Sequence, residues 1–347
     1  MVKILIVDDS VFMRTVIRDM LLKDPLIEIV GTSSNGIDAL EKINSLKPDL
    51  VTLDIEMPKM DGLEVLRELQ KGKNHPKILM LSALTSKDAE MTFEAIRLGA
   101  DDFMLKPKDL PHVRDISEEL IAKVKHLVTL TSPIVPRGAS RHPSGSSEKV
   151  VLIGSSAGGP QQVDILLSEL SADLPASVII TQHMPVGFTA ALAERFNRIA
   201  SMPVKETQNG DLLEKGKILL SKAGVHTIVS GEMGEHGNMT GRIVHTTSSP
   251  VHGVRPAIDK TFESAARVYG RCAVSVILSG MGNDAGLGAY AIKQAGGVSL
   301  VCDEKDCLVY GMVRSAIKNN AVDQVVPLHH LAKEIEQRVL TMEGACV

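Results

Sequence analysis

The sequence predicts an α/β protein with two doubly wound, mainly parallel domains joined by a linker. The chain has 347 residues, which is more than a single core usually organises. Short apolar runs alternate with amphipathic segments in both halves. A stretch rich in Pro, Ser and Gly, residues 131–149, separates the halves and is typical of a flexible linker.

In the first half, five apolar runs predict five strands. They are residues 4–7, 27–30, 50–53, 78–81 and 102–105. Apolar residues at helical spacing lie between the runs, and a last helix is indicated around residues 116–127. Because helical segments alternate with the strands, we expect a parallel sheet covered on both faces. We assign residues 1–125 to this domain, and residues 126–149 to the helix end and the linker.

The second half repeats the pattern over residues 150–347. Four apolar runs predict buried strands at residues 150–153, 178–181, 274–278 and 298–301. The interval from Lys205 to His252 is rich in Gly and in residues that favour strands, and we expect an irregular β excursion there. No repeat relates the two halves, so they are expected to share an architecture only.

Composition excludes several classes of function. The net charge is −4, with 44% hydrophobic and 23% charged residues, which gives no support for a nucleic-acid or membrane surface. No apolar stretch approaches the roughly 18 residues of a membrane span, and the first apolar run is too short for a signal peptide. The cysteines form no CxxC pair, and we expect reduced thiols in a cytoplasmic protein. They are Cys272, Cys302, Cys307 and Cys346.

Acidic residues mark the strand ends of the first domain. Asp8 and Asp9 end the first strand, Asp54 ends the third, Ser82 closes the fourth and Lys106 follows the fifth. In a doubly wound sheet these positions meet at one edge. Adjacent carboxylates repel each other, so we expect a cation there, and carboxylate oxygens suit Mg²⁺. A carboxylate beside Mg²⁺, with an ammonium and a hydroxyl nearby, can attack a phosphoryl group.

These residues lie in "ILIVDDS", "VTLDIEMPKMDG", "MLSA" and "DDFMLKP", through which residues 1–125 resemble the receiver domain of two-component response regulators. The resemblance implies a flavodoxin-like fold with a five-stranded parallel sheet in the order 2-1-3-4-5. It implies that Asp54 accepts a phosphoryl group from a histidine kinase. Mg²⁺ would be held by Asp9, Asp54 and the backbone carbonyl of Glu56, with Asp8 assisting through water.

The same resemblance gives roles to residues around the phosphoryl group. Ser82 would contact the phosphoryl oxygens, Lys106 would pair with them, and Phe103 stands at the position of the aromatic switch residue. It also implies a cis bond between Lys106 and Pro107. A receiver only transmits a signal, so the output function is expected in the second half. A transcription factor is one such output, but the second half shows no helix-turn-helix pattern.

The turn "VLIGSSAGG", residues 151–159, is the main chemical feature of the second half. It lacks the second glycine of a dinucleotide fingerprint and the Lys of a Walker loop. It does contain G-x-S-x-G, which exposes Ser156 at a sharp turn from strand to helix. In such a turn, the N–H of Ala157 points toward a developing oxyanion. Alone the pattern is weak, and it needs a base and an acid nearby.

Both partners follow neighbouring strands. His183 ends the next predicted strand, and Asp284 lies in "ILSGMGNDAG", just beyond another. A neutral imidazole can take the Ser156 proton, and a carboxylate can fix its tautomer and stabilise the imidazolium. The order Ser, His, Asp differs from that of α/β-hydrolases, so we expect a different fold with similar geometry.

The other histidines of this half give no metal site. Their spacings do not form a ligand set, and we expect surface or hydrogen-bonded loop residues, with no zinc and no cofactor in the esterase site. They include His226, His236, His245 and His252.

The second half resembles the catalytic domain of the chemotaxis protein-glutamate methylesterases. The resemblance rests on "VLIGSSAGG", "TQHMPVGFTAALAERF", "GVRPAIDKTFESAA", "ILSGMGNDAGLGA" and "DEKDCLVYGM". It implies hydrolysis of glutamate γ-methyl esters on the cytoplasmic helices of chemoreceptors, with release of methanol, and deamidation of receptor glutamines. Ser156, His183 and Asp284 fall on the triad of this family, and the Met281 N–H would join that of Ala157 in the oxyanion hole.

The chain departs from the family pattern at a few positions. Ala157 replaces the Thr that commonly follows the nucleophile, Val313 replaces a usual Pro, and "ILLSKAGVH" is a weak version of an Ala-Pro-Gly turn. None of these changes touches the three chemical groups, so activity is expected, with an altered rate or receptor preference. Arg255, in "VRPAID", is expected to line the cleft.

The two halves together suggest regulated hydrolysis in chemotaxis adaptation. The hypothesis is that the unphosphorylated receiver packs over the Ser156 cleft, and that phosphorylation of Asp54 shifts a two-state equilibrium toward an open arrangement. The partners would be methylated receptor helices and a histidine kinase, with no nucleic acid and no membrane insertion. The alternative is a catalytically weak signalling scaffold linked to a receiver.

Overall fold

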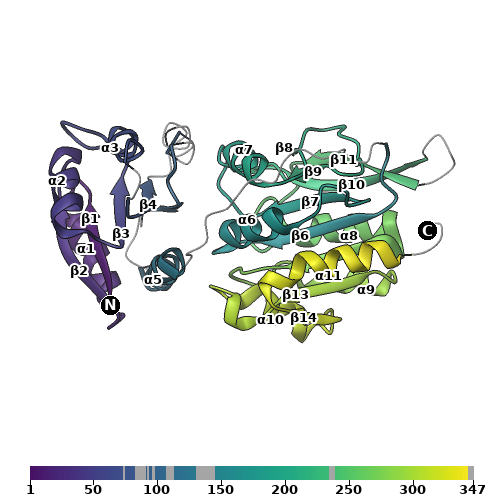
Figure 1. The fold of residues 1–347 in the computed structure, drawn as a ribbon. Helices are drawn as coiled ribbons and strands as arrows, with labels where there is room; N and C mark the ends of the chain where they lie inside the picture. The colour runs from purple at the N-terminus through teal and green to yellow at the C-terminus, as the bar shows by residue number, and fades with distance from the viewer. Residues whose placement is uncertain are drawn as a thin grey trace. The chain divides into compact units, whose positions relative to one another are not determined.

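The computed structural model describes residues 1–72, 75–82, 91, 94–95, 98–106, 113–129, 145–233 and 239–342. The chain divides into two compact units, Met1–Ser132 and Pro133–Val347 (Figure 1). The predicted helix end and linker, residues 126–149, span the boundary between these units. Residues 126–129 end a helix, residues 145–149 are described, and residues 130–144 lie outside the described part. Each unit is built on its own sheet.

The first unit is a five-stranded parallel sheet in the order β2-β1-β3-β4-β5 (Figure 1), which confirms the predicted fold. Its strands are β1 (Val2–Val7), β2 (Ile27–Ser33), β3 (Leu50–Asp54), β4 (Lys77–Ser82) and β5 (Asp102–Leu105). The described helices are α1 (Val11–Leu21), α2 (Gly36–Leu46), α3 (Gly62–Leu69) and α5 (Val113–Thr129).

Side-chain caps set where the first-unit helices begin. The Ser10 hydroxyl accepts the Met13 N–H at the start of α1. Asp61 and Glu64 form a capping box at the start of α3, in which each side chain accepts the other's backbone N–H. A cap of this kind stabilises a helix by about 1 kcal/mol. The caps therefore place α1 and α3 directly after the loops that follow β1 and β3.

The second unit is a seven-stranded sheet in the order β14-β13-β12-β6-β7-β9-β8, with parallel pairing throughout. The four predicted strands form its centre: β6 (Val150–Ser155), β7 (Ser177–Gln182), β12 (Ala273–Ile277) and β13 (Val298–Cys302). Three short strands were not predicted individually, although β9 and most of β8 fall within the predicted β excursion: β8 (Val204–Glu206), β9 (Ile218–Leu220) and β14 (Gln324–Val326). Each has only three residues, too few to show a period.

Helices cover both faces of the second sheet (Figure 1). They are α6 (Gly159–Glu169), α7 (Thr189–Ile199), α8 (Ile258–Tyr269), α9 (Gly286–Gln294), α10 (Gly311–Lys318) and α11 (Leu328–Thr341). One core includes residues of α6, α7 and α11, and the other includes residues of α8, α9 and α10. The predicted β excursion contains the antiparallel hairpin of β10 (His226–Met233) and β11 (Met239–Thr246).

Strand β6 is the central element, buried along its whole length between β12 and β7. The pairs Ser155↔Gln182 and Gly154↔Ile277 set its register. Because the three strands are parallel, their carboxyl ends lie side by side, and the loops that follow them converge at one edge. That edge holds Ser156, directly after β6, and His183, directly after β7.

The structure also bears on the expectations about membrane spans and cysteines. No helix in the described ranges is long and apolar enough to span a membrane. Cys302 and Cys307 carry free thiols. Cys272 is disulfide-bonded, so the expectation of a reduced thiol is wrong for this residue.

Candidate functional site

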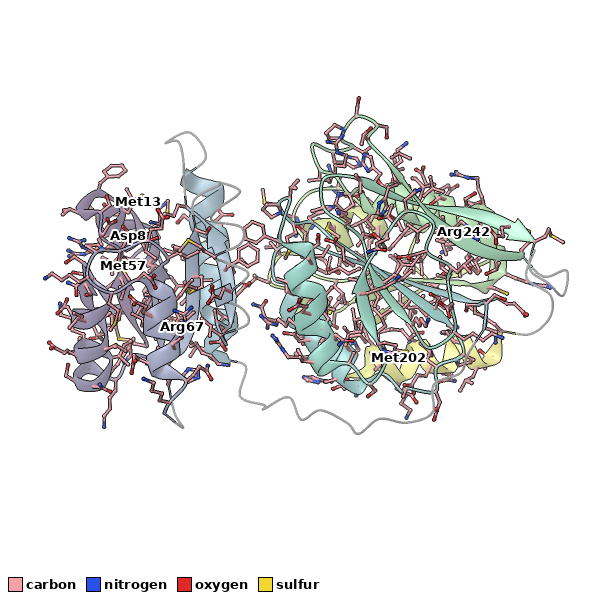
Figure 2. The ribbon with its side chains drawn as sticks, turned by 90° about the horizontal axis from the view of Figure 1, so that it is seen from above. Asp8, Met13, Met57, Arg67, Met202 and Arg242 are labelled. Carbon is pink, nitrogen blue, oxygen red and sulfur yellow. The ribbon has the colours of Figure 1, made fainter. Side chains whose placement is uncertain are left out.

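An acidic cluster lies at the carboxyl edge of the first sheet. Asp8 (labelled in Figure 2) follows β1, and Asp54 is the last residue of β3. One carboxylate oxygen from each of Asp8, Asp9 and Asp54 lies within 4.8 Å of the others. Lys106, directly after β5, places Nζ 2.8 Å from Asp8 Oδ2 and 2.7 Å from Asp54 Oδ2. The structure therefore brings four of the predicted residues together.

Burial controls the charge of this cluster. It raises the pKa of Asp54 to about 6, since the hydrogen bond and charge of Lys106 only partly oppose it and the Asp8 charge adds to it. Burial by itself lowers the pKa of Lys106, but its hydrogen bonds to Asp54 and Asp8 outweigh that effect and raise it. The ammonium therefore stays charged between two carboxylates.

The remaining predicted residues lie on or just after strands β3, β4 and β5. Ser82 is buried at the end of β4, and its carbonyl accepts the N–H of Lys106 at 2.8 Å. Phe103 lies on β5, paired with Met80, and is buried. Glu56 is exposed on the loop after β3. The bond from Lys106 to Pro107 involves a residue outside the described ranges.

The cluster fits a hard divalent cation by the chemistry of its donors. Asp8 is fully buried and Asp54 nearly so, while Asp9 is exposed beside them. Such oxygen donors suit Mg²⁺, which retains waters as its other ligands. Arg14, which the sequence analysis did not single out, donates from Nη1 to the carbonyls of Asp8 (2.6 Å) and Asp9 (3.0 Å). This guanidinium holds the loop that carries the acids.

In the second unit, the turn from β6 to α6 presents Ser156. Gly158 has φ +76°, a conformation that favours glycine, and a side chain there would also meet Leu308 at 2.5 Å. The N–H of Ser156 donates to the carbonyl of Ser279, just beyond β12, at 2.9 Å. Its Cβ lies 3.0 Å from the place where Gly280 would carry one. The turn that presents Ser156 is therefore fixed against the loop after β12.

His183 and Asp284 meet directly. The His183 Nε2 lies 2.7 Å from Asp284 Oδ2, and both side chains are largely buried. Among the described residues no hydrogen bond joins the Ser156 hydroxyl to the His183 ring. Because Nε2 is engaged with the carboxylate, Nδ1 is the ring nitrogen that remains for another partner.

Asp284 is held by backbone donors as well. Its Oδ2 accepts the N–H of Ile258 (2.7 Å), and its Oδ1 accepts those of Asp259 and Ala285 (2.9 Å each). Burial by itself raises the pKa of Asp284, but the hydrogen bond and charge of His183, with the backbone donors, outweigh it and lower the pKa. The carboxylate is therefore ionised and fixed in orientation.

One buried side chain that the sequence analysis did not assign links these parts. The Gln182 amide nitrogen donates to the carbonyls of Ser156 (2.9 Å) and His183 (3.0 Å). Its oxygen accepts the hydroxyl of Ser155 at 2.5 Å. Gln182 directly precedes His183 in "TQHM", but only the register of β6 and β7 shows that it spans both residues.

Two backbone amides at this edge are unengaged. Within the described ranges, the N–H groups of Ala157 and Met281 donate no hydrogen bond to the protein. The peptide that carries the Ala157 N–H also carries the Ser156 carbonyl, which accepts the Gln182 amide at 2.9 Å, and the next carbonyl, that of Ala157, accepts the Ser279 hydroxyl at 2.7 Å. The Met281 side chain is exposed. These N–H groups are therefore available to an external acceptor.

The other predicted residues have structural partners. Arg255 donates from Nη1 to the carbonyls of Thr247 (2.9 Å) and Ser248 (3.2 Å), so it holds that loop. His226 is fully buried and accepts the Ala257 N–H at Nδ1. His252 contacts the carboxylate of Asp259. His236 lies outside the described ranges.

His245 also has a structural partner. It contacts the Thr207 hydroxyl at 2.9 Å, and burial, with the charge of Lys222, lowers the pKa of this ring.

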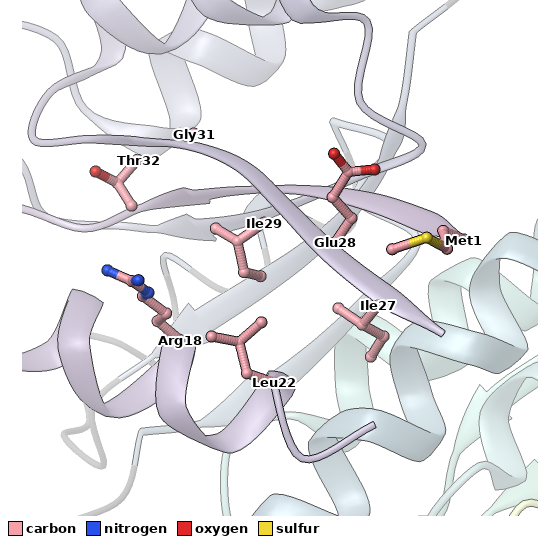
Figure 3. A pocket seen from close by; sticks show the side chains of 8 residues that line it. All are labelled: Met1, Arg18, Leu22, Ile27, Glu28, Ile29, Gly31 and Thr32. Atoms are coloured by element: carbon pink, nitrogen blue, oxygen red, sulfur yellow. The ribbon is translucent and has the colours of Figure 1, made fainter. Parts of the chain in front are cut away.

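A pocket of the first unit lies between α1 and β2 (Figure 3). Its lining contains none of the predicted site residues, so it is a separate feature; it consists of Met1, Arg18, Leu22, Ile27, Glu28, Ile29, Gly31 and Thr32.

Comparison with known proteins agrees with both units. Residues 151–335 match the CheB methylesterase family, and residues 4–118 match the response regulator receiver domain. The chain is 52% identical to protein-glutamate methylesterase/protein-glutamine glutaminase 1 of Methanospirillum hungatei, over 99% of this chain and 100% of that one. It is 40% identical to the corresponding protein of Symbiobacterium thermophilum, over 97% of each chain.

A solved structure supports the assignment of the second unit. The crystal structure of the Thermotoga maritima CheB methylesterase catalytic domain covers 56% of this chain and 99% of its own, at 33% identity and a TM-score of 0.52. The identities extend over the whole chain, and both family matches fall in the order that the sequence predicts. The chain belongs to the family of CheB-type protein-glutamate methylesterases/protein-glutamine glutaminases, in which a receiver domain precedes a methylesterase domain.

Proposed function

We propose that the second unit hydrolyses glutamate γ-methyl esters of chemoreceptors with Ser156, His183 and Asp284 as its catalytic residues. The observation that carries this proposal is the 2.7 Å contact between His183 and Asp284 at the sheet edge where Ser156 follows β6. Ser156→Ala should abolish methanol release from methylated receptor. A Ser156→Ala protein that retained wild-type turnover would contradict the assignment and favour another site.

The arrangement supports acyl transfer in two steps. As Ser156 Oγ attacks the ester carbonyl, its proton passes to Nδ1 of His183, and Asp284 stabilises the imidazolium through Nε2. The N–H groups of Ala157 and Met281 stabilise the oxyanion. His183 then protonates the leaving methoxide, which departs as methanol. Water, deprotonated by the same ring, releases the glutamate and restores the hydroxyl. A glutamine side chain passes through the same acyl-enzyme with release of ammonia.

The first unit is proposed to control this activity through phosphorylation of Asp54 by a histidine kinase. Receiver domains generally use Mg²⁺, which when bound neutralises negative charge on the carboxylates and the phosphoryl group. Asp9, Asp54 and the Glu56 carbonyl would hold it, with Asp8 assisting through water. Lys106, which already contacts both buried acids, would pair with the phosphoryl oxygens.

Two further residues and the organisation of the chain complete the proposal. Ser82 would contact the phosphoryl group, and Phe103 would report its presence by changing position. Residues 1–125 form the receiver, residues 126–149 the connection and residues 150–347 the catalytic domain. The substrates are the methylated helices of receptors that face the cytoplasm, so the enzyme would act there, in chemotaxis adaptation.

A further inference from the structure

Two side chains lie directly behind the proposed triad and have no role in it. Asp259 is the second residue of α8, and its carboxylate is buried. Its Oδ1 accepts the Gly288 N–H at 2.7 Å, and its Oδ2 lies 3.0 Å from Nε2 of His252. Asp284, Asp259 and His252 each place one polar atom within 4.8 Å of the others. His183, Asp284, Asp259 and His252 therefore form one continuous cluster.

The two carboxylates each hold the start of the other's helix. Asp284 precedes α9 but accepts N–H groups from the first two residues of α8, Ile258 and Asp259. Asp259 belongs to α8 but accepts the N–H of Gly288 in the first turn of α9. A side chain at Gly288 would meet the Asp259 backbone at 2.9 Å, so the helices approach closely. A shift of either carboxylate would move the other.

The charges of this cluster agree with the geometry. Burial, followed by the charge of Asp284, raises the pKa of Asp259 to about 6, while Gly288 and His252 oppose the rise. Helix N-termini favour negative charge, which lets two carboxylates lie close together. His252 is exposed in the turn that precedes α8, and its Nε2 faces the Asp259 carboxylate. From β10, His226 accepts the N–H of Ala257, the residue before α8.

The hydrogen bonds favour a positioning role over a cation site. Both oxygens of Asp284 are already engaged, Oδ2 by His183 and Ile258, and Oδ1 by Asp259 and Ala285. We propose that Asp259, held by His252, is a positioning residue for ester hydrolysis that fixes Asp284 and, through it, the ring of His183. This inference rests on the proposed function and adds a residue that positions the triad.

The test compares Asp259→Ala with Asp259→Asn in the full-length protein, using methanol release from methylated receptor between pH 5 and 9. Asp259→Ala should lower kcat about 10- to 100-fold with KM unchanged within about twofold, since misplacement of a catalytic group costs turnover rather than binding. Asp259→Asn keeps an oxygen for the Gly288 N–H and should recover most of kcat. The acidic side of its kcat/KM profile should change, because Asn cannot ionise there whereas the buried carboxyl of Asp259 has a pKa of about 6.

Matched variants separate positioning from loss of structure. Glu263→Gln removes a carboxylate from the same helix and should leave kcat unchanged. His252→Ala should lower kcat several-fold, and the double variant with Asp259→Ala should lose no more than Asp259→Ala alone, because both changes act through one carboxylate.

Specific results would overturn this inference. They are a wild-type kcat for Asp259→Ala, a defect confined to KM, or an Asp259→Asn profile that superposes on the wild type. If Ser156→Ala is inactive while the Asp259 variants behave as wild type, only this inference fails. If Ser156→Ala remains active, the proposed function fails with it.

Discussion

The ring of His183 meets Asp284 through Nε2, at 2.7 Å, so that Nδ1 is the nitrogen left to face a hydroxyl. The carboxylate that fixes this orientation also accepts three backbone N–H groups, from Ile258, Asp259 and Ala285. It therefore both sets the tautomer of the ring and holds the start of α8.

This double role predicts the effect of Asp284→Asn. An asparagine has one acceptor oxygen, and its NH₂ group would oppose two of the present donors and favour the wrong tautomer of His183. We expect kcat to fall about 10³- to 10⁴-fold, as expected for a triad acid, together with a lower melting temperature. Methanol release and thermal unfolding of the same preparation measure the two effects. Unchanged turnover would show that Asp284 does not act with His183.

The hydrogen bonds of Gln182 to the carbonyls of Ser156 and His183 predict that this residue positions the two loops. Gln182→Glu has nearly the same shape, but an ionised carboxylate cannot donate to the carbonyls of Ser156 and His183, and it would repel both. We expect a loss in kcat of about 10- to 100-fold at neutral pH with little change in KM. Steady-state kinetics of Gln182→Glu beside a Gln208→Glu surface control would measure it. Equal kcat in both variants would refute a clamping role.

Asp54 predicts how the stability of the first unit depends on pH. Its pKa is raised to about 6 in the folded state from 3.8, so the folded chain binds more protons between these values than the unfolded chain. The free energy of unfolding should therefore fall as pH rises from about 4 to about 6. Asp54→Asn removes this penalty, which already includes the opposing effect of Lys106, and should stabilise the first unit by about 1–3 kcal/mol at pH 7 without divalent cations.

Chemical denaturation in EDTA at pH 4 and pH 7 measures this effect. The stabilisation of Asp54→Asn should be present at pH 7 and much smaller near pH 4, where the carboxyl is protonated in the folded state and about half protonated in the unfolded state. A gain of equal size at both pH values would show that the effect does not come from the charge of Asp54.

The same variant tests the coupling of the two units. If Asp54 is the phospho-acceptor, a small phosphoryl donor with Mg²⁺ should raise the ester hydrolysis of the wild-type protein. Asp54→Asn should keep a low basal activity that the donor does not raise. Stimulation of the variant by the donor would contradict phosphorylation at Asp54 as the control.

The sequence predicted the parts of the fold that depend on strong patterns. The central strands of both sheets were found because each is a run of buried apolar residues that leads into a polar turn. Strand β14 was missed, and β8 and β9 were expected only as part of an irregular β excursion. Three residues show no period, and the pairing of these strands is decided by neighbours distant in the chain. The reduced state expected for Cys272 was wrong because spacing in the sequence does not reveal contacts in space.

The sequence predicted the site residues that follow strands, but not those placed by register and helix packing. Asp8, Asp54 and Lys106 meet as their strand-end positions require, and so do His183 and Asp284. Gln182 and Asp259 had no assigned role, since their partners come from register and helix packing. His252 was expected as a surface or hydrogen-bonded loop residue, and it contacts Asp259. Which ring nitrogen faces Asp284 also has no signature in the sequence, because it depends on the rotation of a side chain.

The most direct test of the central claim is covalent labelling of the full-length protein with a fluorophosphonate, which reports an activated serine. Peptide mapping should place the label on Ser156, and the labelling rate should fall at least about 100-fold in His183→Ala, because the hydroxyl then lacks its base. A label on another serine, or equal labelling of Ser156 in wild type and His183→Ala, would contradict the account.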